Sequence, residues 1–264
     1  MKIGFIGCGN MGGALARAVI KGECGEVFVS DYNAEKAQTF AKENGAYASD
    51  NLAIASKCDV IFLAVKPNVY SSVLEPLSKT LIARENVLIV SMAAGISVDK
   101  VTSMLGASLP VIRIMPNTPC AIGCGMILWC ASPSVSEESR AVFCEILRCA
   151  GKLDMIDERL IDAASAVSGC GPAFVYMFIE AICDGAVECG LPREKAMLYA
   201  AETLIGAAEM VKQSGKHPGL LKDEVCSPGG STIEGVRALE DGAFRATAAS
   251  AIIAAYEKTK ILGK

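Results

Sequence analysis

The sequence predicts an α/β protein whose doubly wound first domain has a predominantly parallel sheet and is followed by an all-α domain. Up to residue 157, short apolar runs alternate with helical patterns at the spacing of β-α-β units. From Glu158 onward the strand signals stop and only helical periodicity remains. We therefore expect domains at residues 1–157 and 158–264.

The chain opens with a strand, a glycine-rich turn and a helix. The apolar run 2–6 enters Gly7-Cys8-Gly9-Asn10-Met11-Gly12, and helical periodicity continues to Lys21, where Gly22 is expected to form a left-handed cap. In this context G-x-G-x-x-G binds a dinucleotide: the first glycine makes the turn, the second admits the pyrophosphate, and the third packs helix on strand. The helix N-terminus then offers N–H groups to the phosphates. The first cofactor candidates are Gly7, Cys8, Gly9, Asn10, Met11 and Gly12.

A second strand, residues 26–30, ends at Asp31. In dinucleotide-binding folds an acid about 20 residues after the glycines holds a ribose hydroxyl. A glycine-rich turn in an α/β domain without a ligand would explain the glycines but not Asp31. We therefore expect a Rossmann-type cofactor domain with Asp31 in the site.

The remaining elements of the first domain follow in order. Expected helices lie at 34–44 (closed by Gly45), 51–56 (capped by Asp50), 69–81 and 98–105 (capped by Ser97). Expected strands lie at 59–65, 86–91, 111–115, 125–130 and 152–156. Ser134 and Glu137 are expected to form a capping box for the helix that ends near Cys149. Because ligands of such sheets bind outside the carboxyl ends of the strands, the residues after each strand should surround one crevice.

The second domain is expected to contain helices at 159–167, 172–189, 193–212 and 232–262, with a long loop at 214–231 and an interruption at Asp241-Gly242. The helix 172–189 is apolar on nearly all sides. The other helices offer too little cover for it, so we expect a second copy of the chain to pack there.

The segment Cys226-Ser227-Pro228-Gly229-Gly230-Ser231-Thr232 leads directly into a helical pattern. Glycines ahead of a helix N-terminus, with Ser231 and Thr232 at the cap, form a nest of N–H donors suited to a carboxylate. An ordinary capped turn would have the same spacing. Spacing alone leaves both interpretations open.

Composition narrows the class of partner. The net charge is −4, and the sequence has no clustered basic run, which argues against nucleic acid. The longest apolar stretch, 173–187, contains Glu180 and Asp184, whereas a membrane span needs about 20 nearly uncharged residues. The first residues do not resemble a signal peptide. The twelve cysteines are scattered without a C-x-x-C pair, and the one histidine is distant, so we expect a reduced, cytoplasmic protein without a metal site.

Several segments together resemble the pyrroline-5-carboxylate reductase family, over a stretch from Met1 to about Lys260. They are residues 7–12, Ala64-Val65-Lys66-Pro67, Met115-Pro116-Asn117-Thr118-Pro119, Ser168-Gly169-Cys170-Gly171-Pro172-Ala173-Phe174 and Ser227-Pro228-Gly229-Gly230-Ser231-Thr232. The resemblance implies reduction of 1-pyrroline-5-carboxylate to L-proline by NAD(P)H, the last step of proline biosynthesis. It also implies a helical dimerisation domain, a substrate site where the two domains meet, and larger assemblies built from dimers.

The resemblance further implies roles for individual residues. Those implied to line the cofactor are Asn51, Ala64, Val65, Lys66, Pro67, Met92 and Ala93. Those implied to hold the substrate are Ala94, Glu158, Ser227, Gly230, Ser231 and Thr232. Thr232 would stand near the ring nitrogen and is the catalytic candidate. Glu224 departs from an asparagine of the family, Cys170 replaces a common serine, and His217 resembles a turn residue more than a proton donor.

The residues after the second strand bear on the choice between NADH and NADPH. Asp31-Tyr32 occupies the place of an asparagine-arginine pair in NADPH-preferring relatives, and a carboxylate near the 2′-phosphate should cost about 1–4 kcal/mol. We therefore expect NADH to serve at least as well as NADPH. The alternatives are another imine reductase, a hydroxyacid dehydrogenase of the same plan and a non-catalytic cofactor sensor. Hydroxyacid dehydrogenases use a lysine on the long helix, and residues 172–189 contain none.

Overall fold

The computed structural model describes residues 1–84 and 86–262. They form two compact units: unit 1 comprises Met1–Cys170 and the chain from Ala255 onward, and unit 2 comprises Gly171–Ala254. The domain boundary expected after residue 157 stays a prediction. By its contacts, the first helix beyond it, α8 (Glu158–Ser168), groups with unit 1.

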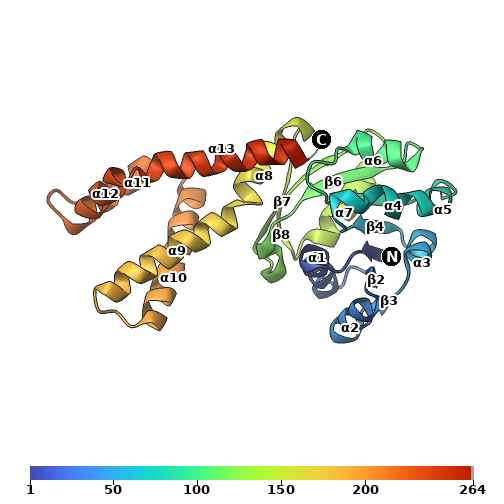
Figure 1. The fold of residues 1–264 in the computed structure, drawn as a ribbon, viewed down its shortest axis with the longest axis horizontal. Helices are drawn as coiled ribbons and strands as arrows, with labels where there is room; N and C mark the ends of the chain where they lie inside the picture. The colour runs from blue at the N-terminus through green and yellow to red at the C-terminus, as the bar shows by residue number, and fades with distance from the viewer. Residues whose placement is uncertain (85, 263–264) are drawn as a thin grey trace. The chain divides into compact units, whose positions relative to one another are not determined.

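Unit 1 is built on an eight-stranded sheet in the order β3-β2-β1-β4-β5-β6-β7-β8 (Figure 1). The strands are β1 (Lys2–Ile6), β2 (Glu26–Ser30), β3 (Tyr47–Ala48), β4 (Val60–Leu63), β5 (Leu88–Ser91), β6 (Val111–Met115), β7 (Gly125–Ala131) and β8 (Gly151–Met155). Neighbouring strands run parallel except β6 and β7, which are antiparallel. The predicted doubly wound, predominantly parallel sheet is confirmed, although the short β3 was not expected.

The helices of unit 1 are α1 (Asn10–Lys21), α2 (Ala34–Asn44), α3 (Asn51–Lys57), α4 (Tyr70–Leu74), α5 (Ser78–Ile82), α6 (Val98–Leu105), α7 (Glu137–Leu147) and α8. Short 3₁₀ segments are η1 (Pro67–Val69), η2 (Glu75–Leu77) and η3 (Thr118–Ile122). Three predicted caps are confirmed. Gly45 closes α2 at φ 70°, and the Asp50 and Ser97 side chains accept the N–H groups of Ala53 and Lys100.

Three local predictions in unit 1 are wrong. Gly22 has φ −77°, and the left-handed residue after α1 is Glu23, at φ 53°. The helix expected over 69–81 is split into α4 and α5, because Pro76 lacks an N–H and clashes with the preceding turn. The cap of α7 is Ser136, which accepts the N–H of Ser139, so Ser134 and Glu137 form no capping box.

Helices cover both faces of the sheet, and alternate residues of the central strands enter two different hydrophobic clusters. Phe5 and Phe62 stack at 4.4 Å in the first cluster, with α1 and α7. Ile61 and Leu63 enter the second cluster, with α3 to α6. Because the sheet is buried on both sides, the positions of its strand ends are fixed by packing.

Unit 2 is helical. Its elements are α9 (Gly171–Glu188), α10 (Arg193–Ser214), α11 (Pro218–Val225), α12 (Ser231–Asp241) and the first part of α13 (Phe244–Leu262). The interruption predicted near Gly242 is confirmed, with Ala243 at φ 54°. The long loop expected over 214–231 is wrong, since it contains α11. The local signals for α11 were Pro218 at its first position and His217, whose ring accepts the N–H of Gly219.

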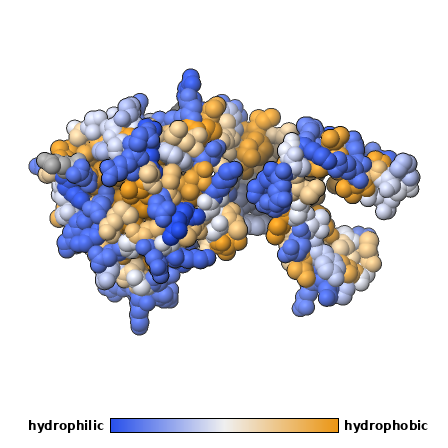
Figure 2. Space-filling view, turned by 180° about the vertical axis from the view of Figure 1, so that it is seen from behind, coloured by the Kyte–Doolittle hydropathy of each residue, from blue (hydrophilic) through white to orange (hydrophobic). Residues whose placement is uncertain are grey.

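Unit 2 buries little of its apolar surface within the described chain. Its fully buried hydrophobic cluster consists of Cys183, Ala196 and Ala200. Large side chains such as Met177 and Ile205 are 69% and 58% exposed, and the space-filling view shows hydrophobic patches over these helices (Figure 2). The helices of unit 2 therefore present an extended apolar surface.

Among the residues that the structure describes, one stretch, Glu158–Glu188, is long and apolar enough to cross a membrane by those two criteria alone. A single helix of this kind is weak evidence for a span, because helices that pack against other protein pass the same test.

Candidate active site

The glycine-rich turn connects β1 to α1 and is shaped by three glycines with different surroundings. Gly7 has φ 102°, and its N–H donates to Ser30 O at 2.8 Å. A Cβ on Gly12 would lie 2.2 Å from Gly7 O, so this glycine is required for the helix to approach the strand. A Cβ on Gly9 would meet nothing within 4 Å. Gly9 is therefore the glycine whose backbone is open to a ligand.

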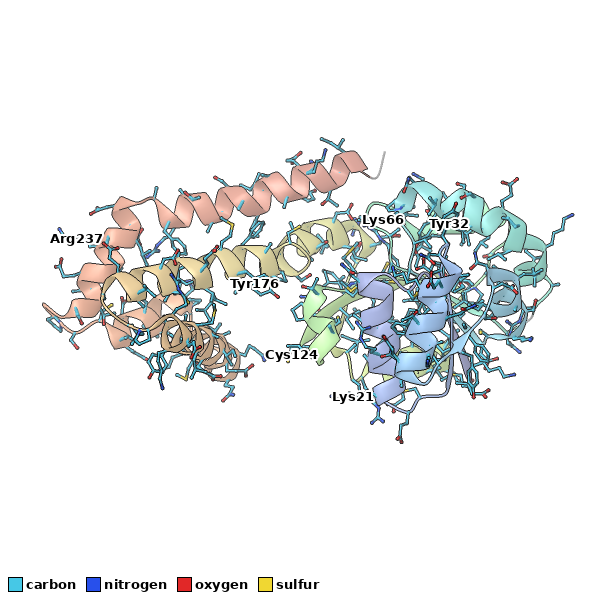
Figure 3. All side chains as sticks on the ribbon, turned by 60° about the horizontal axis from the view of Figure 1, so that its bottom comes forward. Lys21, Tyr32, Lys66, Cys124, Tyr176 and Arg237 are labelled. Carbon is cyan, nitrogen blue, oxygen red and sulfur yellow. The ribbon has the colours of Figure 1, made fainter. Side chains whose placement is uncertain are left out.

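A cavity of about 650 Å³ lies at the carboxyl ends of the strands of unit 1. Most of the predicted cofactor residues line it, together with Ala94, which was expected near the substrate. The lining includes Gly7, Gly9, Asn10, Met11, Gly12, Asp31, Tyr32, Ala64, Val65, Lys66, Pro67, Met92, Ala93, Ala94, Met115 and Pro116. Tyr32 and Lys66, labelled in Figure 3, are exposed side chains of this lining. Five segments far apart in the sequence thus share one cavity.

Two predicted cofactor residues lie outside this lining. Cys8 is buried behind the turn, and its thiol donates to Asp31 Oδ2 at 3.4 Å. Burial, and then the charge of Asp31, raise the pKa of the Cys8 thiol to about 11. Asn51 begins α3 and lines a neighbouring cavity of about 740 Å³, where its Oδ1 accepts the Ser30 hydroxyl at 2.6 Å. Asp31 lines both cavities.

Asp31 is held by three neighbours. Its Oδ2 accepts the N–H of Cys8 at 3.0 Å, its Oδ1 accepts the N–H of Asn33 at 3.2 Å, and Lys36 Nζ lies 3.7 Å from Oδ2. Burial acts to raise the pKa of this carboxyl, but the two N–H groups, the Cys8 thiol and Lys36 outweigh it and lower the pKa. Asp31 is therefore a fixed anion between the two cavities.

Sequence reasoning missed Tyr70, which joins two strand ends of the site. Its hydroxyl donates to Leu63 O at 2.8 Å, lies 3.2 Å from Ser91 Oγ and accepts the N–H of Met92. Burial raises the pKa of Tyr70 to about 12, so the phenol stays neutral. Its neighbours in the sequence, Asn68, Ser71 and Ser72, give no sign of burial, so the only available signal was that a buried tyrosine needs a polar partner. Tyr70 sets the spacing between the Ala64 and Met92 segments of the cavity.

The structure places Glu158 at the first position of α8. Its Oε1 accepts the N–H of Val98 at 2.8 Å and lies 3.1 Å from Arg113 Nη1. Sequence reasoning did not single out Arg113, since an arginine within an apolar strand gives no indication of its partners. One oxygen of the Glu158 carboxylate, Oε1, thus meets both of these partners within unit 1.

The predicted substrate loop lies in unit 2, ahead of α12. Gly229 has φ 68°, and the N–H of Gly230 donates to Ser227 O at 3.0 Å, which closes a turn. The cap residue of α12 is Gly230, without a side-chain bond, so the expectation that Ser231 and Thr232 cap the helix is wrong. Ser231 and Thr232 lie in the first turn and are exposed. Because no cap bond holds their hydroxyls, these groups and the N–H groups of the first turn can face a ligand.

The two residues whose role the sequence left open both have partners near α11. His217 caps α11 through Nδ1, in agreement with the turn interpretation. Glu224 Oε1 accepts from Lys216 Nζ at 2.6 Å, and both side chains are about half exposed.

All twelve cysteines are free thiols. Within residues 1–84 and 86–262, no group of three His, Cys, Asp or Glu side chains is placed to hold a metal ion.

The residues present fit a dinucleotide. The open backbone at Gly9, the N-terminus of α1 and the carboxylate of Asp31 all line the same cavity. Groups of these three kinds bind the pyrophosphate and the ribose in dinucleotide-binding folds.

Comparisons with known proteins agree with this geometry. Residues 158–262 match the family described as pyrroline-5-carboxylate reductase dimerisation, and residues 2–95 match the family described as NADP oxidoreductase, coenzyme F420-dependent. The chain is 41% identical over 267 residues to pyrroline-5-carboxylate reductase of Escherichia coli (strain K12), covering all of this chain and 98% of that protein.

Solved structures give the same result. Pyrroline carboxylate reductase of Plasmodium falciparum, crystallised with NADP bound, aligns with a TM-score of 0.90 at 35% identity and full coverage of both chains. The 1-pyrroline-5-carboxylate reductase of Streptococcus pyogenes aligns with a TM-score of 0.90 at 32% identity, covering 98% of each chain.

Proposed function

The chain belongs to the pyrroline-5-carboxylate reductase family, and from that premise we propose how its residues divide the work of the reaction. It is an NAD(P)H-dependent oxidoreductase that reduces the cyclic imine 1-pyrroline-5-carboxylate to L-proline. When bound, the reduced nicotinamide supplies the hydride that adds to the carbon of the ring C=N bond. The chain has to hold both molecules, orient them and stabilise the charge at the ring nitrogen.

The cofactor role is assigned to the cavity of unit 1. The open backbone of Gly9 and the first N–H groups of α1 bind the pyrophosphate, while Asp31 binds the adenosine ribose together with Asn51 in the neighbouring cavity. Residues 64–67 and 92–93 line the nicotinamide half. The observation that supports this assignment is the shared lining of one cavity by the turn, Asp31 and these two strand ends.

NADH is proposed to serve at least as well as NADPH. Both oxygens of Asp31 already accept backbone N–H groups, so the carboxylate stays charged and fixed beside the place of a 2′-phosphate. Lys36, 3.7 Å from Asp31, reduces this repulsion but is half exposed and screened by solvent.

The substrate role is assigned to the loop before α12, with Ala94 at the cofactor cavity. The hydroxyls of Ser227 and Ser231 and the backbone from Gly230 onward bind the substrate carboxylate, and Thr232 Oγ1 lies near the imine nitrogen. Two features support this assignment: the loop places free N–H groups at a helix N-terminus, and its hydroxyls are not used as caps. The resemblance placed Glu158 in the substrate site, but we assign it no substrate contact, because its Oε1 accepts the N–H of Val98 and lies 3.1 Å from Arg113 Nη1.

Self-association follows from the dimerisation family to which residues 158–262 belong. We propose that the dimer forms through helices between Pro172 and Leu262, that larger assemblies are built from dimers, and that the enzyme acts in the cytoplasm without nucleic-acid or membrane partners. The exposed apolar side chains of α9 and α10 support the dimer.

The test of the proposal is oxidation of reduced nicotinamide with three substrates. Turnover is expected with 1-pyrroline-5-carboxylate, at a kcat/KM well above that for a six-membered cyclic imine and for a hydroxyacid couple. A higher value for the six-membered ring would instead make the protein a general imine reductase. Measured with NADH and NADPH in parallel, kcat/KM is expected to be at least equal for NADH, and a tenfold preference for NADPH would contradict the role given to Asp31.

A further inference from the structure

Arg113 is a buried cation that none of the roles above uses. It lies in β6, and its side chain is 4% exposed. Its Nη2 donates to Asp162 Oδ1 at 2.7 Å and its Nη1 to Glu158 Oε1 at 3.1 Å. Both carboxylates lie in the first half of α8, one turn apart, so the guanidinium fork fastens this helix to the sheet.

Glu158 extends this connection to a third element. The oxygen that meets Arg113 also accepts the N–H of Val98, the first residue of α6. A helix N-terminus leaves such N–H groups without partners inside the helix, and here a side chain from α8 supplies the missing acceptor. The segment that leads into α6 contains Met92, Ala93 and Ala94, which line the cofactor cavity.

The opposite end of α8 is fastened in the same region. Asn117 is buried, its Nδ2 donates to Ser168 O at 2.9 Å, and its Oδ1 accepts the N–H of Met126. Met115 and Pro116, which stand between Arg113 and Asn117 in the chain, line the same cavity. Arg113 and Asn117 therefore hold the two ends of α8. The two cavity residues, Met115 and Pro116, lie between them in the sequence.

We propose that Glu158 and Arg113 are positioning residues of the reductase. Arg113 holds the Glu158 carboxylate, and Glu158 holds the start of α6, which fixes the 92–94 wall of the cavity against which the nicotinamide half of the cofactor lies. The inference rests on the proposed cofactor role of that wall. Glu158 thereby acts on the reaction through Val98, without touching the substrate.

The alternative is an ion pair that only holds the fold together. A buried ion pair can often be replaced without loss of stability, so stability alone does not distinguish the two roles. The distinguishing feature is the single hydrogen bond to Val98, since it connects the cluster to the cavity wall. The experiment therefore removes that bond from each side.

Five variants of the full-length enzyme are compared with the native protein by NADH binding, followed through nicotinamide fluorescence, and by steady-state kinetics. Glu158→Ala removes the acceptor, and Glu158→Gln keeps an oxygen for Val98. Asp162→Asn weakens the other half of the Arg113 cluster without touching Val98. Val98→Pro removes the N–H donor together with the valine side chain, at a helix position that accepts proline and after a residue already extended at ψ 163°. Val98→Ala controls for the lost side chain.

Glu158→Ala and Val98→Pro are expected to raise the NADH Kd about tenfold and to lower kcat by up to ~10²-fold, the effect of a misplaced reacting group. Glu158→Gln should stay within about threefold of native on both measures, and Asp162→Asn and Val98→Ala should bind NADH as the native enzyme does.

The inference is overturned if Glu158→Ala and Val98→Pro fold and bind NADH normally. It is also overturned if Glu158→Ala and Glu158→Gln both change only the KM for the imine substrate, because that pattern indicates direct substrate contact. Should Glu158→Ala fail to fold, Val98→Pro decides alone. If the native protein binds NADH but does not turn over the imine, the proposed function fails while the binding comparison still tests the positioning role.

Discussion

The two units of this chain use apolar residues in opposite ways. In unit 1 the central strands and their helices form two clusters whose members are almost completely buried. In unit 2 the fully buried cluster of described residues contains a cysteine and two alanines, while methionine, leucine and tyrosine side chains remain exposed along α9 and α10. Unit 1 buries its apolar side chains within one chain, whereas the apolar surface of unit 2 is open to a second chain.

This difference assigns different tasks to the two units. A cavity bordered by strand ends that are packed on both faces keeps its shape without a partner, which suits the binding of a cofactor. A set of helices with an open apolar surface suits association, and residues 158–262 belong to a dimerisation family. We therefore expect substitutions in unit 1 to affect cofactor binding and substitutions in unit 2 to affect dimerisation or substrate chemistry.

The largest effect is expected from a charge on the open surface of unit 2. Met177 is 69% exposed on α9 and follows Tyr176 in the sequence, which Figure 3 labels on this helix. We expect Met177→Glu to weaken dimerisation by about 3 kcal/mol, or more than ~10²-fold, because an unpaired carboxylate would be buried in the interface. Phe178, the next residue along α9, is a poorer site for this test, because it packs on Phe244 at 5.4 Å and would report on the monomer fold as well.

Light scattering and sedimentation measure this effect. Ile122→Glu is the control, since Ile122 is 75% exposed in unit 1 and should leave the oligomer unchanged. A native protein that is a stable monomer would contradict the assignment of dimerisation to unit 2. So would a Met177→Glu variant that dimerises as the native protein does.

The next effect concerns chemistry assigned to unit 2. Thr232→Val keeps the shape of the side chain and removes its hydroxyl. We expect kcat to fall by ~10²-fold if the hydroxyl stabilises charge at the ring nitrogen, by analogy with oxyanion-hole donors. NADH binding and the melting temperature should not change, because Gly230 rather than Thr232 is the cap of α12. The measurements are kcat, KM and cofactor Kd.

Two other results for Thr232→Val would be informative. A raised KM with native kcat would make Thr232 a binding residue only. Native values of both would remove Thr232 from the site and leave the backbone of the Gly229-Gly230 loop to bind the substrate.

A smaller effect is expected at the cofactor turn of unit 1. The structure can accommodate the methyl group of Gly9→Ala, since a Cβ at this position would meet nothing within 4 Å. We expect unchanged stability and dimerisation but a cofactor Kd raised about tenfold, because the methyl group occupies the approach of the pyrophosphate. Gly12→Ala is the contrasting variant, whose Cβ would lie 2.2 Å from Gly7 O and should destabilise the fold itself. Native cofactor affinity in Gly9→Ala would show that the pyrophosphate lies elsewhere.

The last effect, on stability rather than on binding, is expected for Tyr70→Phe, within the core of unit 1. The variant loses the hydroxyl that joins Leu63, Ser91 and Met92, and it leaves the Met92 N–H without this acceptor. We expect the free energy of unfolding to fall by about 1–2 kcal/mol, with the oligomeric state unchanged. Denaturant titration measures the loss. A loss of dimerisation in this variant would show that the two units are not independent in this respect.

The sequence by itself determined the fold class, the glycine turn, the caps of α2, α3 and α6 and the family. These features are local or periodic: a strand buried on both faces is continuously apolar, and Gly45 or Asp50 acts within one helical turn of its own position. The ends of the predicted strands also placed the segments 64–67 and 92–94 around one crevice with the turn, and the structure brings them into one cavity. Their individual roles remain proposals.

Only the tertiary structure decided the contacts that join distant segments. The sequence does not indicate the partners of Tyr70, Arg113 and Asn117. The partner of Asn117, for example, is Ser168, 51 positions away. The sequence also suggested caps at Ser134 and Thr232 where the chain uses Ser136 and Gly230. The physical reason is that periodicity and propensity act over a few residues, whereas the partner of a buried polar group depends on which elements the packing places beside it.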